Sequence, residues 1–214
     1  METSASFEAR SAPSSYSTGS GWPNPALLLL ASGVSGKCWL HMRCLSSYDA
    51  NMSREPIERF FGLLAEQAAG FYGDRLVSLA VFGSHASGRA RPGSDLDVLI
   101  VLSEAPPRRR LRLEEYDRLE ERLGGALTSL EQAGWPLDLS PVIRTRDEAE
   151  GFSVLYLDMT VDVRVLIDRG EFLRRRLNRL RARLEELGAR RQPLDGGWYW
   201  VLKENYRPGE VFEI

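Results

Sequence analysis

Two aspartates in one short segment of the chain could together bind a divalent metal ion. Asp95 and Asp97 lead into the apolar run Val98–Leu102, and the whole segment has the pattern of a buried strand. Side chains at positions i and i+2 of a strand point to the same side, about 6.5 Å apart along the backbone. The two carboxylates can therefore converge on one or two hard cations, which prefer oxygen ligands.

A Gly-Ser pair precedes these aspartates and could bind phosphate. Gly83 and Ser84 follow a second apolar run, Leu76–Phe82, and ten residues separate Ser84 from Asp95. Gly83 lacks a Cβ, so its backbone can approach a phosphate closely. The Ser84 hydroxyl and neighbouring backbone amides can donate hydrogen bonds to phosphate oxygens. Two buried strands joined by this loop therefore predict a site for a metal ion and a phosphorylated ligand.

Other polar residues lie in the same loop, and their roles stay open. Arg89 and Arg91 could reach a triphosphate or pyrophosphate, and solvent-exposed arginines are the equal alternative. Ser94, directly before the first aspartate, is a further candidate for binding a nucleotide. His85 is more often a bystander than a catalytic group in such a position.

The Gly-Ser pair, the gap of ten residues and Asp-x-Asp together resemble the signature of the DNA polymerase β nucleotidyltransferase superfamily. The resemblance is to its minimal members in particular, among them the antitoxins that are paired with HEPN-domain toxins, and it covers about residues 55–145. It implies a mixed sheet flanked by helices and a divalent metal held by Asp95 and Asp97. It also implies an activity, the transfer of a nucleoside monophosphate from an NTP.

Members of the superfamily also use a third carboxylate on a neighbouring strand, and Asp138 is the best match in position. The resemblance implies that Asp138 completes the metal site or takes the proton from the acceptor. An aspartate beside Ser140 and Pro141 could instead shape a turn. Asp158 and Asp162 are alternative carboxylates, although helix capping and surface exposure explain both of them more simply.

The resemblance also sets expectations for cofactors and partners. We expect two Mg²⁺ ions, with Mn²⁺ possible, and ATP as the favoured NTP. The sequence shows none of the large domains of polymerases or RNA-tailing enzymes, so we expect a compact acceptor system. The acceptor hydroxyl would belong to a partner protein, as in toxin–antitoxin adenylylation, to an RNA end, or to a small molecule such as an aminoglycoside. The alternative is a non-catalytic module that binds a nucleotide or a partner.

Apolar periodicity predicts the elements that hold the motif in place. Helices are expected at 57–68 and 116–130, and strands at 76–82, 95–102 and 135–143. The order helix, strand, strand, helix, strand predicts an α/β fold of the α+β type, with a mixed β-sheet flanked by helices. We assign this nucleotidyltransferase core to residues 53–150.

Residues 151–214 are predicted to form a small extension of helices and strands. A helix is expected at Glu171–Ala189, where leucines recur at helical spacing and six arginines surround them. Its basic face is either solvated or a docking surface for RNA or a partner. A strand is expected at Trp198–Leu202, and the segment 161–167 could be a strand or a short helix.

Composition bounds the remaining possibilities. The 214 residues carry a formal net charge of −2, which argues against a bulk nucleic-acid binder and leaves RNA binding by a local patch open. Residues 1–52 are rich in serine, glycine and proline, which predicts a disordered leader or a start assigned too far upstream. The two cysteines indicate no disulfide framework, so we expect a cytoplasmic protein without a membrane segment.

Overall fold

The computed structural model describes residues 54–194, 197–207 and 210–214. The predicted leader, residues 1–52, lies outside the described residues. Six α-helices are described: α1 Glu55–Tyr72, α2 Gly83–Ala86, α3 Arg109–Gln132, α4 Arg146–Glu150, α5 Val154–Met159 and α6 Phe172–Glu186. Six strands are described: β1 Leu76–Phe82, β2 Leu96–Leu102, β3 Leu139–Thr145, β4 Val163–Asp168, β5 Arg190–Leu194 and β6 Gly197–Val201. Two short 3₁₀ turns, Gly73–Arg75 and Arg169–Glu171, precede β1 and α6.

Four of the strands form one mixed sheet in the order β3-β2-β1-β4. β1 pairs antiparallel with both β2 and β4, whereas β2 and β3 run parallel. The parallel pair is joined through α3, because strands that run the same way need a long crossover. This mixed sheet flanked by helices confirms the predicted fold class.

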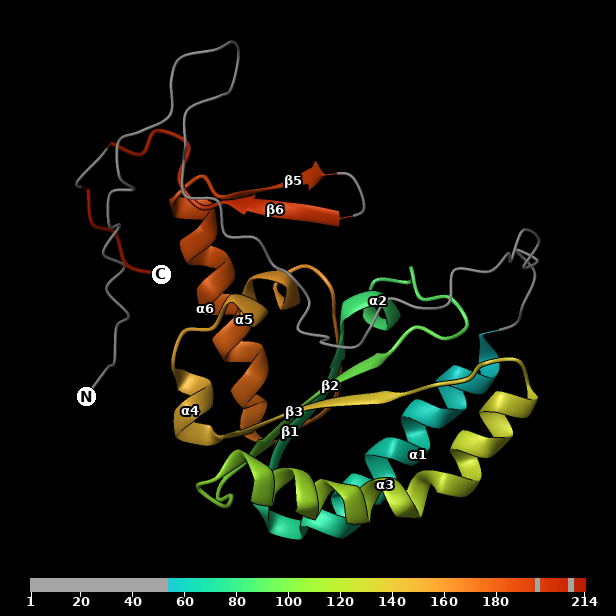
Figure 1. Ribbon diagram of the computed structural model, residues 1–214. Helices are drawn as coiled ribbons and strands as arrows, with labels where there is room; N and C mark the ends of the chain where they lie inside the picture. The colour runs from blue at the N-terminus through green and yellow to red at the C-terminus, as the bar shows by residue number, and fades with distance from the viewer. Residues whose placement is uncertain (1–53, 195–196, 208–209) are drawn as a thin grey trace, which may run out of the picture.

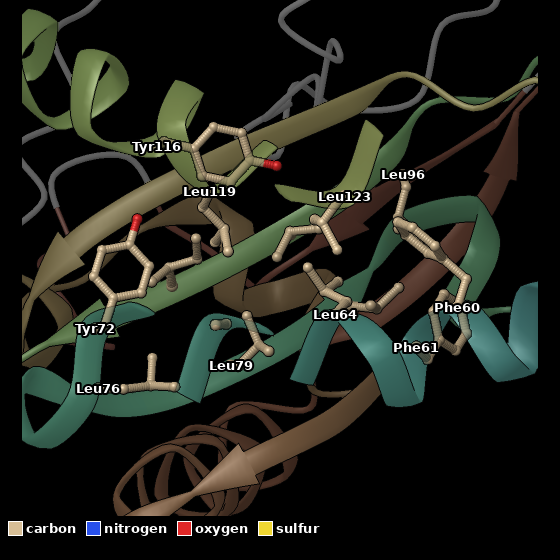
Figure 2. Packing of buried hydrophobic residues seen from close by; sticks show 14 of the residues in the cluster. Phe60, Phe61, Leu64, Tyr72, Leu76, Leu79, Leu96, Tyr116, Leu119 and Leu123 are labelled. Carbon is tan, nitrogen blue, oxygen red and sulfur yellow. The ribbon is translucent and has the colours of Figure 1, made fainter. Parts of the chain in front are cut away.

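α1 and α3 cover one face of the sheet (Figure 1). Pro56 lies in the first turn of α1, where a helix tolerates a missing backbone N–H. Apolar side chains of the two helices pack with alternate residues of β1 and β2, as Figure 2 shows for part of the cluster. Leu64, Leu96 and Leu119 have no exposed surface in this layer.

The opposite face of the sheet is covered by α4, α5 and α6 (Figure 1). The leucine stripe predicted for the last long helix lies on the buried side of α6, with Leu173, Leu177, Leu180 and Leu184 against this second core layer. Because both faces are covered, all seven residues of β1 are buried. A central strand of this kind reads as a continuous apolar run rather than an alternating one.

Residues beyond 150 contribute to the same sheet. The segment 161–167, whose type the sequence leaves open, contains β4, and this strand pairs with β1 on the side away from β2. Several arginines of α6 donate to backbone oxygens instead of facing only solvent. Arg176 donates to the carbonyls of Ala149 and Gly151, and Arg181 donates to that of Thr160. These bonds tie α6 to the segments around α4 and α5.

β5 and β6 form a separate two-stranded antiparallel sheet. The strand predicted at 198–202 is β6. Among the described helices, none combines the length and the apolar composition needed to cross a lipid bilayer.

Candidate functional site

Gly83 and Asp97 are in direct contact at the end of β1. Phe82, the last residue of β1, lies opposite Asp97 of β2, and the chain then turns sharply with Gly83 at φ 70°. A Cβ built on Gly83 would lie 2.3 Å from Oδ2 of Asp97. The positive φ favours glycine here, and any side chain at this position would have to displace the Asp97 carboxylate.

The loop after Gly83 is held by hydrogen bonds within its own backbone. The short helix α2 begins at Gly83, and the carbonyl oxygen of Ser84 accepts hydrogen bonds from the amides of Arg89 and Ala90, both at 3.0 Å. The hydroxyl of Ser87 donates to the same oxygen at 3.1 Å. These bonds hold Ser84 in a partly exposed position directly after the glycine.

His85 is a buried anchor of this loop. Its side chain is 6% exposed, and its Nε2 lies 3.1 Å from the carbonyl oxygen of Ser94. Burial lowers the pKa of the imidazole, so the neutral form is favoured. Because Ser94 directly precedes Asp95, His85 positions the start of the acidic segment.

Ser94 closes a turn that presents the first aspartate. Its hydroxyl oxygen accepts a hydrogen bond from the amide of Arg91 at 3.0 Å, and its own amide donates to the carbonyl of Arg91 at 2.9 Å. The hydroxyl is thus engaged within the turn. Arg91 is exposed and Asp95 lies at the surface, next to the partly buried Asp97.

The two aspartates of the motif repel one another in this arrangement. Burial, together with the charge of Asp95, raises the pKa of Asp97 to about 6. None of the ion pairs formed among the described residues involves either carboxylate. A half-buried carboxylate beside a second acid is costly unless a cation compensates it. The donor set of Asp95 and Asp97 therefore fits a hard divalent cation.

The backbone of Asp138 lies beside the backbone segment that carries Asp95 and Asp97. Its carbonyl oxygen accepts a hydrogen bond from the amide of Leu96 at 2.8 Å, which places Asp138 across from the acidic segment, one residue before β3. Its exposed carboxylate acts on Glu120 of α3, whose pKa is raised by burial and by the charges of Asp117 and Asp138. Within the part of the chain that the structure describes, no three His, Cys, Asp or Glu side chains gather closely enough to hold a metal.

The other flank of Gly83 is occupied by a set of contacts that the sequence does not predict. β4 pairs with β1 so that Val163 lies opposite Phe82, and Asp162 therefore ends up beside the loop. The Asp162 carboxylate accepts hydrogen bonds from Arg89 at 3.3 Å and from Arg191 of β5 at 2.9 Å. The expected alternatives for Asp162, capping and simple exposure, do not describe this bridge.

Asp158 has an equally specific role. Its Oδ1 accepts hydrogen bonds from the indole nitrogens of Trp198 and Trp200, at 2.7 and 2.9 Å. These bonds hold β6 against the end of α5. The aromatic run Trp198–Trp200 predicts a strand in the sequence, but nothing there indicates its pairing with Asp158, some forty positions earlier.

A family model and several solved structures match parts of this chain. Residues 66–154 match the family model described as a nucleotidyltransferase domain. A search of the curated proteins found no match to the chain. Among solved structures, one titled as a toxin-antitoxin with AMP-PNP is 15% identical, with 58% of this chain and 92% of that chain covered and a TM-score of 0.38. One titled as the toxin-antitoxin MntA-HepT is 14% identical, with 59% and 92% covered and a TM-score of 0.35.

The matched segment contains the loop that begins at Gly83, both aspartates of the motif and Asp138. It also contains β1, β2 and β3, whereas β4 lies beyond its end. The chain carries a nucleotidyltransferase domain at residues 66–154 and is, by that domain, a transferase.

Proposed function

We propose that the protein transfers a nucleoside monophosphate, with AMP from ATP favoured, to a hydroxyl group in a metal-dependent reaction. The observation that carries this proposal is the contact between Gly83 and Asp97. At this contact the partly exposed backbone of Gly83 lies next to two carboxylates, and no cationic side chain of the described residues forms an ion pair with either of them. Metal ions bound to a triphosphate would supply the positive charge that the two carboxylates need. The phosphates would lie against the backbone of Gly83.

Asp95 and Asp97 would hold the divalent cations, with two Mg²⁺ expected and Mn²⁺ possible. When bound, the cations neutralise the triphosphate and stabilise the attacking and leaving oxygens of an in-line displacement. Cation binding also relieves the repulsion between the two carboxylates, which contributes to the raised pKa of Asp97.

The remaining residues of the site would bind and orient the reactants. Gly83 and Ser84 would contact phosphate oxygens through the backbone and the hydroxyl, with Ser94 and Arg89 close by. The acceptor oxygen forms a bond to the α-phosphorus, the bond from that phosphorus to its bridging oxygen breaks, and pyrophosphate leaves. Asp138 would take the proton of the acceptor hydroxyl, because it lies across from Asp95, directly before β3, and is open to solvent.

For the acceptor, we propose a hydroxyl of a partner protein. This follows from the likeness of the motif to the minimal members of the superfamily. An RNA end or a small molecule such as an aminoglycoside is the alternative acceptor. The rival from another class, a module that binds nucleotide without turnover, accounts poorly for two acids placed against a phosphate loop, since like charges there weaken anion binding unless cations are bound.

Labelling with each of the four NTPs, radioactive at the α-phosphate, tests the proposal. The full chain is incubated with Mg²⁺ and extract of the source cells, and protein, RNA and small molecules are separated afterwards. Transfer of the α-label to a protein band, with Asp97→Asn as the inactive control, is the expected result. Label on RNA or on a small molecule would replace the acceptor. No Mg²⁺-dependent label in any fraction, with intact ATP binding, would favour the binding module.

A further inference from the structure

A cluster of four side chains lies beside the phosphate loop and brings together distant parts of the chain. We call Arg89, Asp162, Arg191 and Trp198 the bridging cluster. Asp162 Oδ2 accepts a hydrogen bond from each arginine, at 3.3 Å from Arg89 Nη2 and 2.9 Å from Arg191 Nη1. The two guanidinium groups also lie over the Trp198 ring, at 4.3 and 4.1 Å from its centroid. Two residues of the cluster come from the β5–β6 hairpin, outside the matched domain.

The bridging cluster lies on the opposite side of Gly83 from the acidic pair. Phe82 is opposite Asp97 on one neighbouring strand and opposite Val163 on the other, and Asp162 directly precedes Val163. Two strand spacings, roughly 10 Å in all, therefore separate the backbones that carry the acidic pair and Asp162. In Figure 1 the β5–β6 hairpin lies at the end of the sheet where α2 lies. A ligand that extends from the metal-binding acids across Gly83 would reach the cluster.

The charge of the bridging cluster suits an anion. Two guanidinium groups share a single carboxylate, which leaves one net positive charge. Each guanidinium has five N–H groups and gives only one of them to Asp162, so most of its donors remain for a ligand. The Arg89 side chain is 47% exposed, whereas those of Arg191 and Asp162 are 19% and 21% exposed. Two N–H groups of one guanidinium can bind two oxygens of the same carboxylate or phosphate at once.

The hairpin that carries Arg191 is fixed before any ligand binds. Asp158 holds the indoles of Trp198 and Trp200, and Trp198 in turn lies against both guanidinium groups. A guanidinium held in place loses less side-chain freedom when it meets a phosphate. Trp198, already in contact with two arginines, is a positioning residue here and not a platform for a base.

We propose that Arg191 is a nucleotide-binding residue that, with Arg89, binds the β- and γ-phosphates of the NTP and the departing pyrophosphate. Trp198 holds the two guanidinium groups in place, and Asp162 occupies one N–H of each until a phosphate competes for them. The inference rests on the proposed function and extends its site to the C-terminal hairpin. The two guanidinium groups form no covalent bond and transfer no proton. Their role is to stabilise the negative charge that develops on the leaving pyrophosphate.

Binding of ATP, ADP and AMP to the full chain in the presence of Mg²⁺ tests this inference by isothermal titration calorimetry. Arg191→Gln should weaken ATP binding by about tenfold or more, the usual range for charge-assisted hydrogen bonds. AMP binding should change less than ATP binding, because AMP has neither of the outer phosphates. Arg190→Gln is the matched control, since Arg190 is the adjacent residue of β5 and pairs with Glu204 at the surface. The control should bind all three nucleotides as the wild type does.

Asp162→Asn gives an effect of opposite sign. The amide keeps the shape and one acceptor oxygen, but it removes the carboxylate that competes with phosphate for the two arginines. ATP binding should then become tighter, while a purely structural role of the cluster predicts weaker binding. Weaker ATP binding in Asp162→Asn would overturn the inference, even where Arg191→Gln does not fold.

The outcomes separate this inference from the proposed function. If the wild type binds no ATP with Mg²⁺, the proposed function itself fails. If the wild type binds ATP and Arg191→Gln binds it equally well, only the role of Arg191 fails. An equal loss of ATP and AMP affinity in Arg191→Gln, together with a lower Tm, would make Arg191 a structural tie of the hairpin and would likewise overturn the inference.

Discussion

The Cα of Gly83 lies so close to the carboxylate of Asp97 that a Cβ at position 83 would lie 2.3 Å from Oδ2. The phosphate loop and the proposed metal ligand are therefore built as one unit. A side chain at position 83 would displace the carboxylate, and a displaced carboxylate would misplace the cation that it holds.

Gly83→Ala should therefore lower both nucleotide transfer and stability. We expect at least a roughly tenfold loss of transfer, since misplaced catalytic groups are costly, and a loss of stability beyond the roughly 1 kcal/mol that a positive φ costs a non-glycine residue. Gly93→Ala is the matched control, because Gly93 also has a positive φ, 82°, but no atom lies within 4 Å of the place its Cβ would take. Equal effects of both substitutions on Tm and on transfer would show that backbone strain alone matters.

Replacement of Asp95 or Asp97 by asparagine should lower nucleotide transfer without lowering the stability of the metal-free protein. Asp95→Asn and Asp97→Asn keep the shape of the side chain and remove the charge that holds the cations, so transfer should fall by on the order of 10²-fold or more. The Tm of the metal-free protein should stay the same or rise, because the repulsion between the two acids is gone. Transfer by either variant at the wild-type rate would remove the pair from the active site.

The stability of the metal-free protein should depend on pH through Asp97. Its pKa is raised from 3.8 to about 6 in the folded protein, so the folded state binds more protons than the unfolded state between these values. The contribution of Asp97 to stability therefore falls as pH rises from about 4 to about 6 and stays low above that. Measured in EDTA, the Tm difference between Asp97→Asn and the wild type should be small at about pH 4 and should grow by about pH 7. A difference that is constant over this range would contradict the assignment of the raised pKa.

The strands around the site could be predicted from the sequence because each is a local pattern. The run Leu76–Phe82 is the same in prediction and structure, since a strand covered on both faces is apolar throughout. The apolar pattern predicts a third strand from Trp135, but β3 begins at Leu139. Trp135 contributes to the apolar pattern because it packs into the core ahead of the strand, at 5% exposure. Pro136 has no N–H to donate to a neighbouring strand.

The bridging cluster could not be predicted in this way. The link between Asp162 and Arg191 spans twenty-nine positions, and it forms because β4 joins the sheet and the hairpin folds back over the loop. The sequence marks Asp162 only as an alternative carboxylate, and Arg191 is one of several arginines near α6. His85 is a similar case, because its burial depends on where the loop after Gly83 packs and not on its neighbours in sequence.

The assignment of the proton acceptor can be decided by comparing three aspartates. Asp138 lies across from Asp95, directly before β3, and is exposed, whereas Asp162 accepts hydrogen bonds from Arg89 and Arg191. The Asp162 oxygen already accepts hydrogen bonds from two guanidinium groups, so it is not free to accept a proton from an acceptor hydroxyl. We therefore expect Asp138→Asn to lower turnover by about 10²-fold, in the range of general base catalysis, with Mg²⁺-dependent ATP binding largely retained. Asp162→Asn should not lower turnover.

Asp117→Asn is the control for this comparison, since Asp117 is also an exposed aspartate that raises the pKa of Glu120. An effect of Asp138→Asn that works only through the charge around Glu120 would reappear in Asp117→Asn, while a role as base would not. Single-turnover rates and ATP affinities of the three variants, measured in parallel, separate these possibilities. A steep loss of turnover in Asp162→Asn with a silent Asp138→Asn would move the base to the β4 side of Gly83, and the acceptor would then have to enter beneath the β5–β6 hairpin.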